Sequence, residues 1–240
     1  MKNNILKEII LKRAGIPAAA FLISVLLGTM IQGCSDSSNT VSPTSQTDNI
    51  GLSVKFNDAA LDNPDAAIQI TEAKALVSEL EIETSDSSSS HEIKLTPFVV
   101  NFDITGGLRD VLSAYIPSKT YKKIKFQIHK PEDNETPPDP EFSTGGRYSF
   151  IIKGTYNGNS FVFKSRKTVN IVLTMNNAIN ISTTKLNLTM IINKLQWFLQ
   201  NGGEIDPRNP SNEDTIDDNI RNSFKNVFRD DDRNGIPDDN

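Results

Sequence analysis

The chain has 240 residues and a formal net charge of −5, with 37% hydrophobic and 23% charged residues. This composition is typical of a globular protein with a continuous core, and the acidic balance argues against a nucleic-acid partner, which usually meets a basic patch. The single cysteine excludes an intramolecular disulfide framework, and the two histidines leave little material for a zinc cluster or a Ser/His/Asp triad.

The first 34 residues have the layout of a secretory signal. Positive charges end at Arg13, and an apolar run then covers residues 14–31. The run ends in Ile31-Gln32-Gly33-Cys34, which resembles the lipobox of bacterial lipoproteins. The resemblance implies lipid attachment to the Cys34 thiol and removal of residues 1–33 as a signal peptide. Two alternatives stay open, namely an uncleaved membrane-spanning anchor and an unmodified thiol after ordinary cleavage.

Residues 34–49 are expected to form a lipidated flexible tether, because the segment 35–49 contains almost no apolar residue. Two or more acyl chains would hold the protein stably at a membrane. Ser35 stands where Gram-negative lipoproteins of the inner membrane commonly carry Asp, so the resemblance implies the outer membrane. We therefore predict a lipid-anchored protein of the cell envelope, facing the periplasm or the cell surface.

Residues 50–200 alternate apolar and polar side chains with a period of two. Leu52, Val54 and Phe56 are separated by polar residues. The same alternation recurs within residues 98–104, 124–128, 148–152, 169–173 and 186–192. Such alternation predicts half-buried antiparallel strands, and many short strands joined by turns predict a β-sandwich. The expected fold class is mainly β, an antiparallel β-sandwich of immunoglobulin- or transthyretin-like type with a C-terminal helix.

Residues 71–83 fit two patterns. Ala73, Val77 and Leu80 lie at helical spacing, but a strand with a bulge aligns Val77 with Ile82. We favour the strand because the surrounding segments are β.

Several connections are also readable. Residues 108–115 are expected to form a short helix or turn over one end of the sandwich. Residues 131–146 form an acidic, proline-rich loop, and Asn157-Gly158 is a hairpin signal. Residues 56–60 (FNDAA) and 121–128 resemble segments of uncharacterised β-sandwich lipoproteins of environmental bacteria, which implies no activity.

A helical pattern begins at Ser211, with Asp214 as a capping partner three residues later. The apolar residues on one face of this helix are Ile216, Ile220, Phe224, Val227 and Phe228. We predict a helix over residues 211–228, packed on the sandwich or on a partner. Residues 201–240 would then form an appendage to the sandwich, made of this helix and a calcium loop.

The sharpest motif follows the helix. Counting Asp230 as position 1 puts Asp232, Asn234, Gly235, Ile236 and Asp238 at positions 3, 5, 6, 7 and 9. This is the spacing of an EF-hand-type loop, in which side-chain oxygens and one backbone carbonyl converge on calcium and glycine permits the turn. The segment resembles the calcium loops of thrombospondin type 3 repeats and dockerins, which implies a structural Ca²⁺ ion held by Asp230, Asp232, Asn234, Ile236 and Asp238.

The motif departs from its relatives at position 12, which the sequence does not reach. We expect the missing ligand from the Asn240 terminal carboxylate, from Asp206 or Asp217, or from water. Binding should be weak, with a dissociation constant on the order of 10⁻⁴–10⁻³ M. The alternative is a solvated acidic tail with a turn at Asn234-Gly235.

No other motif points to chemistry. His129 alternates onto a polar face and is expected at the surface, Trp197 is expected in the core, and a flexible loop over residues 131–146 would be a poor site for a glycosidase pair. We therefore predict a non-catalytic binding module whose ligand is a glycan or an envelope protein. The alternative is an assembly lipoprotein that docks a larger envelope complex through its C-terminal helix, with an enzyme third. Deletion of residues 204–240 is expected to discriminate the first two, because loss of complex co-purification with an intact sandwich would favour assembly.

Overall fold

The structure, a computed structural model, describes residues 47–57 and 67–238. The expected signal peptide, Cys34 and most of the expected tether lie outside these ranges. Within them the elements are β1 (Ile50–Phe56), β2 (Ile68–Thr84), β3 (Ser90–Asn101), β4 (Arg109–Ala114), β5 (Thr120–Ile128), β6 (Phe150–Tyr156), β7 (Asn159–Ser165), β8 (Val169–Asn180), β9 (Leu186–Ile192), β10 (Leu199–Gln200), β11 (Gly203–Glu204), α1 (Glu213–Ser223) and β12 (Phe224–Arg229), with 3-10 turns at Pro140–Phe142, Lys194–Gln196 and Pro210–Asn212.

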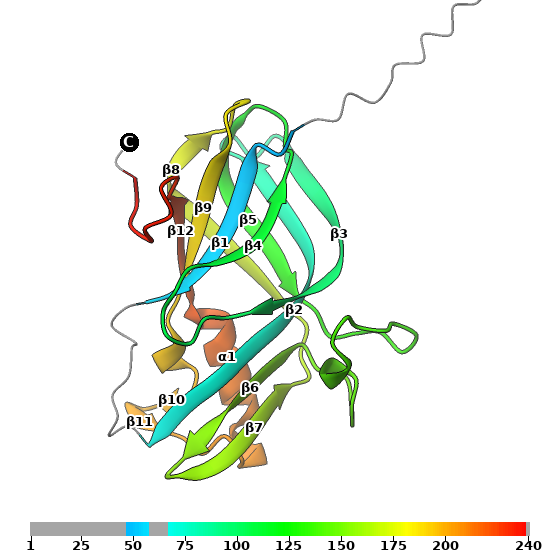
Figure 1. The fold of residues 1–240 in the computed structure, drawn as a ribbon, viewed down its shortest axis with the longest axis vertical. Coiled ribbons are helices and arrows are strands. Elements are labelled where there is room, and N and C mark those ends of the chain that lie inside the picture. Colours follow the sequence, from blue (N-terminus) through cyan, green and yellow to red (C-terminus); the bar gives the residue numbers. More distant parts are fainter. Residues whose placement is uncertain (1–46, 58–66, 239–240) are drawn as a thin grey trace, which may run out of the picture. The chain divides into compact units, whose positions relative to one another are not determined.

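Two larger sheets face each other (Figure 1). The four-stranded sheet has the order β12-β9-β1-β4, and the six-stranded sheet has the order β7-β6-β2-β5-β8, with β3 also paired to β2. The pairs within these sheets are antiparallel, except that β1 and β9 run parallel. The predicted mainly β class with antiparallel sheets and a C-terminal helix is confirmed.

The long strand β2 links the two halves of the six-stranded sheet. Its first half pairs with β6 and its second half with β5, while β3 lies along its other edge. The pairing shifts register between Val77 and Glu79. This bulge moves the apolar phase by one residue, so that Val77 before it and Leu80 and Ile82 after it are all buried. The strand interpretation of residues 71–83, with its bulge, is confirmed.

The core lies between the sheets because alternate side chains point inward. Leu52, Val54 and Phe56 of β1 are each only 2% exposed. Trp197 is fully buried, and its ring meets those of Phe56 and Phe150 edge-on at centroid distances of 5.4 Å. Its indole Nε1–H donates to Ser223 Oγ at 2.8 Å, as a buried tryptophan requires. The prediction that Trp197 is a core residue is confirmed.

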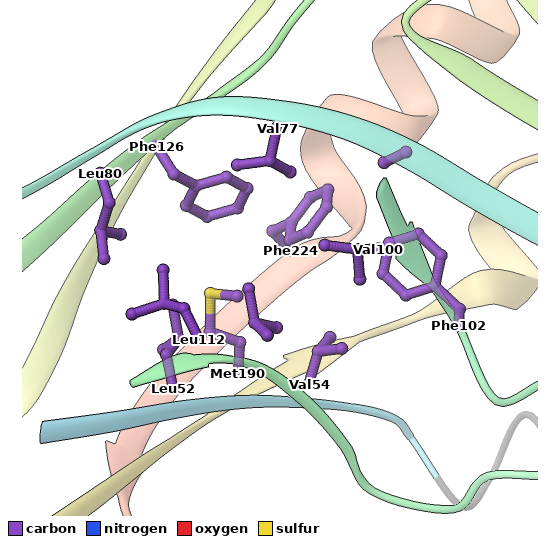
Figure 2. A pocket seen from close by; sticks show the side chains of 12 residues that line it. Leu52, Val54, Val77, Leu80, Val100, Phe102, Leu112, Phe126, Met190 and Phe224 are labelled. Atoms are coloured by element: carbon purple, nitrogen blue, oxygen red, sulfur yellow. The ribbon is translucent and has the colours of Figure 1, made fainter. Parts of the chain in front are cut away.

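An apolar cavity of about 20 Å³ remains between the sheets. Figure 2 shows Leu52, Val54 and Met190 on one side of it and Val77 and Leu80 on the other. A space this small has the size of one water molecule, and its apolar lining gives water no hydrogen-bond partner. The cavity is therefore too small for a ligand much larger than a water molecule.

Residues 109–114 form strand β4, so the predicted helix or turn over residues 108–115 is wrong. The strand pairs antiparallel with the outer edge of β1, for example Leu52 with Leu112. Its side chains are half-buried or exposed on both faces of the strand. The sequence of this segment therefore does not alternate between apolar and polar residues, which is the signal that predicted the other strands. Backbone pairing with β1 determines the conformation of this segment.

The predicted helix over residues 211–228 is too long, because α1 ends at Ser223 and the chain continues as β12. Strand β12 pairs antiparallel with the free edge of β9, with a register shift between Phe224 and Asn226. The shift lets Phe224 and Val227 both reach the core, which is why their spacing imitates a helix. The predicted cap at Ser211 is also wrong, because the N-cap is Asn212 and its side chain makes no capping hydrogen bond.

Candidate metal centre

The candidate calcium loop, residues 230–238, follows β12 and returns across the outer face of the four-stranded sheet. Figure 1 shows this red segment beside β12 and β9. The Asp230 N–H donates to the Asn187 carbonyl of β9 at 2.9 Å, and the Asp238 N–H donates to the Arg229 carbonyl at 2.9 Å. Arg233 forms an ion pair with Asp110 of β4. Residues from three strands thus hold the loop against the sheet.

Asp230, at position 1, is fully buried under the loop. Its Oδ2 accepts hydrogen bonds from Thr189 Oγ1 at 2.6 Å and from the Gly235 N–H at 3.0 Å. Its Oδ1 is buried and has no hydrogen-bond partner among the described residues. Leaving a buried polar atom unpaired costs about 1–3 kcal/mol, and more for a charged group. The loop therefore contains one buried carboxylate oxygen that accepts no hydrogen bond from the described residues.

The next positions are arranged by short turns. Asp232 Oδ1 accepts the Asn234 N–H at 3.2 Å, and Asn234 Oδ1 accepts the Ile236 N–H at 2.7 Å. Gly235 has a φ of +80°, which glycine adopts without strain. Asp238 Oδ2 accepts the Asp231 N–H at 2.6 Å. The backbone thus turns at the position where the sequence predicts the turn.

The possible ligands of the loop are all oxygen atoms, which is the chemistry that a hard cation such as Ca²⁺ prefers. These oxygen atoms do not, however, surround a single point. Within the described ranges, no three carboxylate, imidazole or thiol groups lie close enough together to hold a metal ion. The oxygens of Asp232, Asn234 and Asp238 instead accept hydrogen bonds within the loop. A bound Ca²⁺ would draw on these oxygens, the Ile236 carbonyl and Asp230 Oδ1, and would give Oδ1 a partner.

Two residues named as sources of the missing ligand have other partners. Asp206 forms a two-point ion pair with Arg208, and Asp217 is buried on α1 beside Lys167, at 3.7 Å. The expectation that either supplies the position-12 oxygen is therefore not supported by their contacts. The Asn240 carboxylate lies outside the described residues.

The acidic loop over residues 131–146 is not a flexible connection. Phe142 is fully buried, and Lys74 Nζ lies 2.5 Å from Asp139 Oδ2 and 2.7 Å from Glu141 Oε2. Burial acts most strongly and raises the pKa of both carboxyls, but the hydrogen bonds and positive charges of Lys74 and its neighbours together hold each pKa below its ordinary value. These carboxylates fasten the loop to β2 as ion pairs, a role that the sequence analysis missed.

His129 is not a surface residue, so that prediction is wrong. Its side chain is 12% exposed, and Nε2 lies 2.6 Å from Glu135 Oε2. The acidic loop folds back over this end of β5 and covers the ring. Burial acts to raise the pKa of Glu135, but the hydrogen bonds from His129 and the Glu132 N–H hold it below its ordinary value. The pair fixes the start of the loop.

The chain matches no protein-family model, no curated protein and no solved structure. Among the residues described, no helix is long and apolar enough to cross a membrane. The apolar run over residues 14–31 is not among them.

Proposed function

We propose that the protein is a non-catalytic binding module of the bacterial cell envelope, anchored by lipid on Cys34 and carrying a structural calcium ion in loop 230–238. The observation that carries the calcium proposal is the buried, unpartnered Oδ1 of Asp230. A cation at this position would both pair this oxygen and offset the negative charge of a buried carboxylate. The spacing of the oxygens at Asp232, Asn234 and Asp238 selects calcium among common cations.

Calcium would hold loop 230–238 in place on the four-stranded sheet. The loop returns over β9 and reaches β4 through the ion pair of Arg233 with Asp110. An ion that joins Asp230 to Asp238 would fix the path of the chain across these strands. A weak site of this kind is filled where calcium is abundant, as for extracellular modules, which agrees with the proposed location outside the cytoplasm.

Calcium should raise the melting temperature of a soluble version that begins at Ser35. With a dissociation constant on the order of 10⁻⁴–10⁻³ M, about 10 mM calcium stabilises the fold by about 1.4–2.7 kcal/mol, or about 3–11 °C in Tm. Asp230→Asn keeps the shape of the side chain but removes the charge, so it should lose most of this gain. Calorimetric titration and melting curves with calcium, magnesium and EDTA measure both effects.

The matched control is Asp133→Asn, which removes the same charge from a side chain that is 91% exposed on another loop. It should respond to calcium like the wild type. Two results together would rule out the calcium site. They are a calcium titration of the wild type that gives no heat of binding, and wild-type melting curves that are the same in calcium and in EDTA.

The lipid anchor has its own test in the full-length chain. Cys34→Ser removes the thiol that would be acylated, so the variant should leave the membrane fraction and keep the size of the precursor. The neighbouring Ser37→Ala should behave like the wild type. Fractionation and intact mass measure the difference. A Cys34→Ser protein that matures and stays with the membrane would refute the anchor.

The proposed ligand class is an envelope protein. Aromatic rings are the usual platforms for stacked sugars, and in the described part the exposed large hydrophobic residues are Val162, Val172, Leu195 and Ile236, none of them aromatic. This favours a protein over a glycan. Assembly through α1 is less favoured, because its apolar side chains Ile216 and Ile220 are already buried in the domain.

A further inference from the structure

Three buried polar side chains lie between loop 230–238 and the four-stranded sheet. Ser53 of β1 and Thr189 of β9 are 0% exposed, and Asn187 of β9 is 8% exposed. They alternate with the core residues of their strands and thus point to the outer face of the sheet. Polar residues on an outer face are usually solvated, so their burial needs an explanation. The loop covers them.

These side chains form a directed chain of hydrogen bonds that ends on Asp230. Asn187 Nδ2 donates to Thr189 Oγ1 at 3.2 Å, so the Thr189 hydroxyl has its own proton left to donate to Asp230 Oδ2 at 2.6 Å. An ionised carboxylate only accepts, so Thr189 donates to Asp230 and accepts from Asn187 Nδ2, which turns Asn187 Oδ1 toward Ser53 Oγ at 3.1 Å. The chain of hydrogen bonds runs from Ser53 to Asp230.

Two further residues surround this chain. Asp110 is a second acceptor for the Ser53 hydroxyl, since its Oδ1 also lies 3.1 Å from Ser53 Oγ, and Arg233 of the loop binds the same carboxylate. Gly51 makes room for the amide, because a Cβ at this position would lie 2.8 Å from Asn187 Oδ1. The parallel pairing of β1 and β9 puts Gly51 opposite Asn187 and Ser53 opposite Thr189.

We propose that Thr189 is a positioning residue for the calcium site, and that the four-stranded sheet sets the calcium affinity through the chain Ser53–Asn187–Thr189. Thr189 and the Gly235 N–H both donate to Oδ2 of Asp230, which leaves Oδ1 as the oxygen without a hydrogen-bond partner among the described residues. The inference rests on the proposed calcium site. Without the hydroxyl, the carboxylate can rotate, and binding must first restore its orientation.

The test compares calcium titrations of single variants of the soluble version. Thr189→Val removes the hydroxyl and keeps the branched shape, and should weaken calcium binding about 10-fold or more, as is usual when a group that orients a metal ligand is lost. Thr189→Ser keeps the hydroxyl and should stay within about 3-fold of the wild type by the same reasoning. Gly51→Ala lies on a different strand, β1, and its added methyl group displaces the side chain of Asn187 on β9. This variant should also weaken calcium binding, as Thr189→Val does.

Thr174→Val on β8 is the matched control, because Thr174 is exposed, and it should bind like the wild type. Circular dichroism in EDTA verifies that each variant is folded. Wild-type affinity in Thr189→Val, or equal losses in Thr189→Val and Thr189→Ser, would overturn this inference and leave the calcium site standing. A wild type that binds no calcium would overturn both.

Discussion

Deletion of residues 204–240 should unfold the domain and not merely detach an appendage. The deleted segment contains α1, which buries Ile216 and Ile220, and β12, which places Phe224 and Val227 in the core. Loss of one such side chain costs about 2–5 kcal/mol, and a whole domain is stable by only about 5–15 kcal/mol. The truncated protein should therefore lack a cooperative thermal transition when it is followed by circular dichroism.

A shorter truncation provides the control. Removal of residues 230–240 keeps α1 and β12 and deletes only the loop, so this protein should still melt cooperatively, although it no longer responds to calcium. If the longer deletion also kept a wild-type spectrum and a sharp transition, residues 204–229 would be dispensable for the fold. The deletion therefore cannot serve as a test of partner binding, contrary to the expectation from sequence.

Replacing Asp217 with Asn should stabilise the protein at neutral pH. Asp217 is 2% exposed, and neither carboxylate oxygen accepts a hydrogen bond from the described residues. Burial raises the pKa of Asp217, and two weaker interactions offset only part of this effect: the Ser165 hydroxyl, which does not reach full hydrogen-bond geometry, and the Lys167 ammonium, 3.7 Å from Oδ2. A buried charge without hydrogen bonds is costly, so we expect a gain of about 1–3 kcal/mol at pH 7.

The gain should depend on pH in a defined direction. Because the folded-state pKa of Asp217 lies above the unfolded value, the folded protein binds the proton more tightly. The wild type thus loses stability as pH rises from about 4 through the raised pKa, and Asp217→Asn does not. Glu213 and Asp214 on the same helix raise the pKa further.

Urea unfolding from pH 4 to 8 measures this difference. Asp218→Asn changes the same charge on the same helix at a side chain that is 57% exposed, and it should show no comparable gain. A gain for Asp217→Asn that is independent of pH, or no gain at all, would contradict the interpretation.

The amphipathic strands could be predicted from sequence because their pattern is local. In β1, residues Leu52, Val54 and Phe56 face the core, and their alternation is visible in seven residues of sequence. The bulge in β2 was also visible, because the apolar phase shifts after Val77. Strands β4 and β12 were missed because pairing with β1 and β9 determines their conformation, and such long-range pairing leaves little trace in a short segment.

The candidate loop was partly predictable for the same reason. Its own oxygens are spaced within nine residues, so the sequence reveals them. The residues that orient them are remote, since Thr189 lies 41 positions before Asp230. Their approach depends on the β9–β12 pair, and the role of Gly51 depends on the parallel β1–β9 pair. The burial of Asp217 was hidden as well, because it lies at the edge of the apolar stripe of α1.

The place of β1 in the four-stranded sheet has a mechanical consequence. The strand begins at Ile50, directly after the proposed tether, and is bonded to β9 on one side and β4 on the other. A force applied through a membrane anchor would act along the axis of β1. It would load the backbone hydrogen bonds of β1 with β9 and with β4 in shear, so that many hydrogen bonds would have to break together and not one after another. If Cys34 carries the lipid, the chain enters the domain at a strand that is hydrogen-bonded along both of its edges and so resists a pull from the anchor.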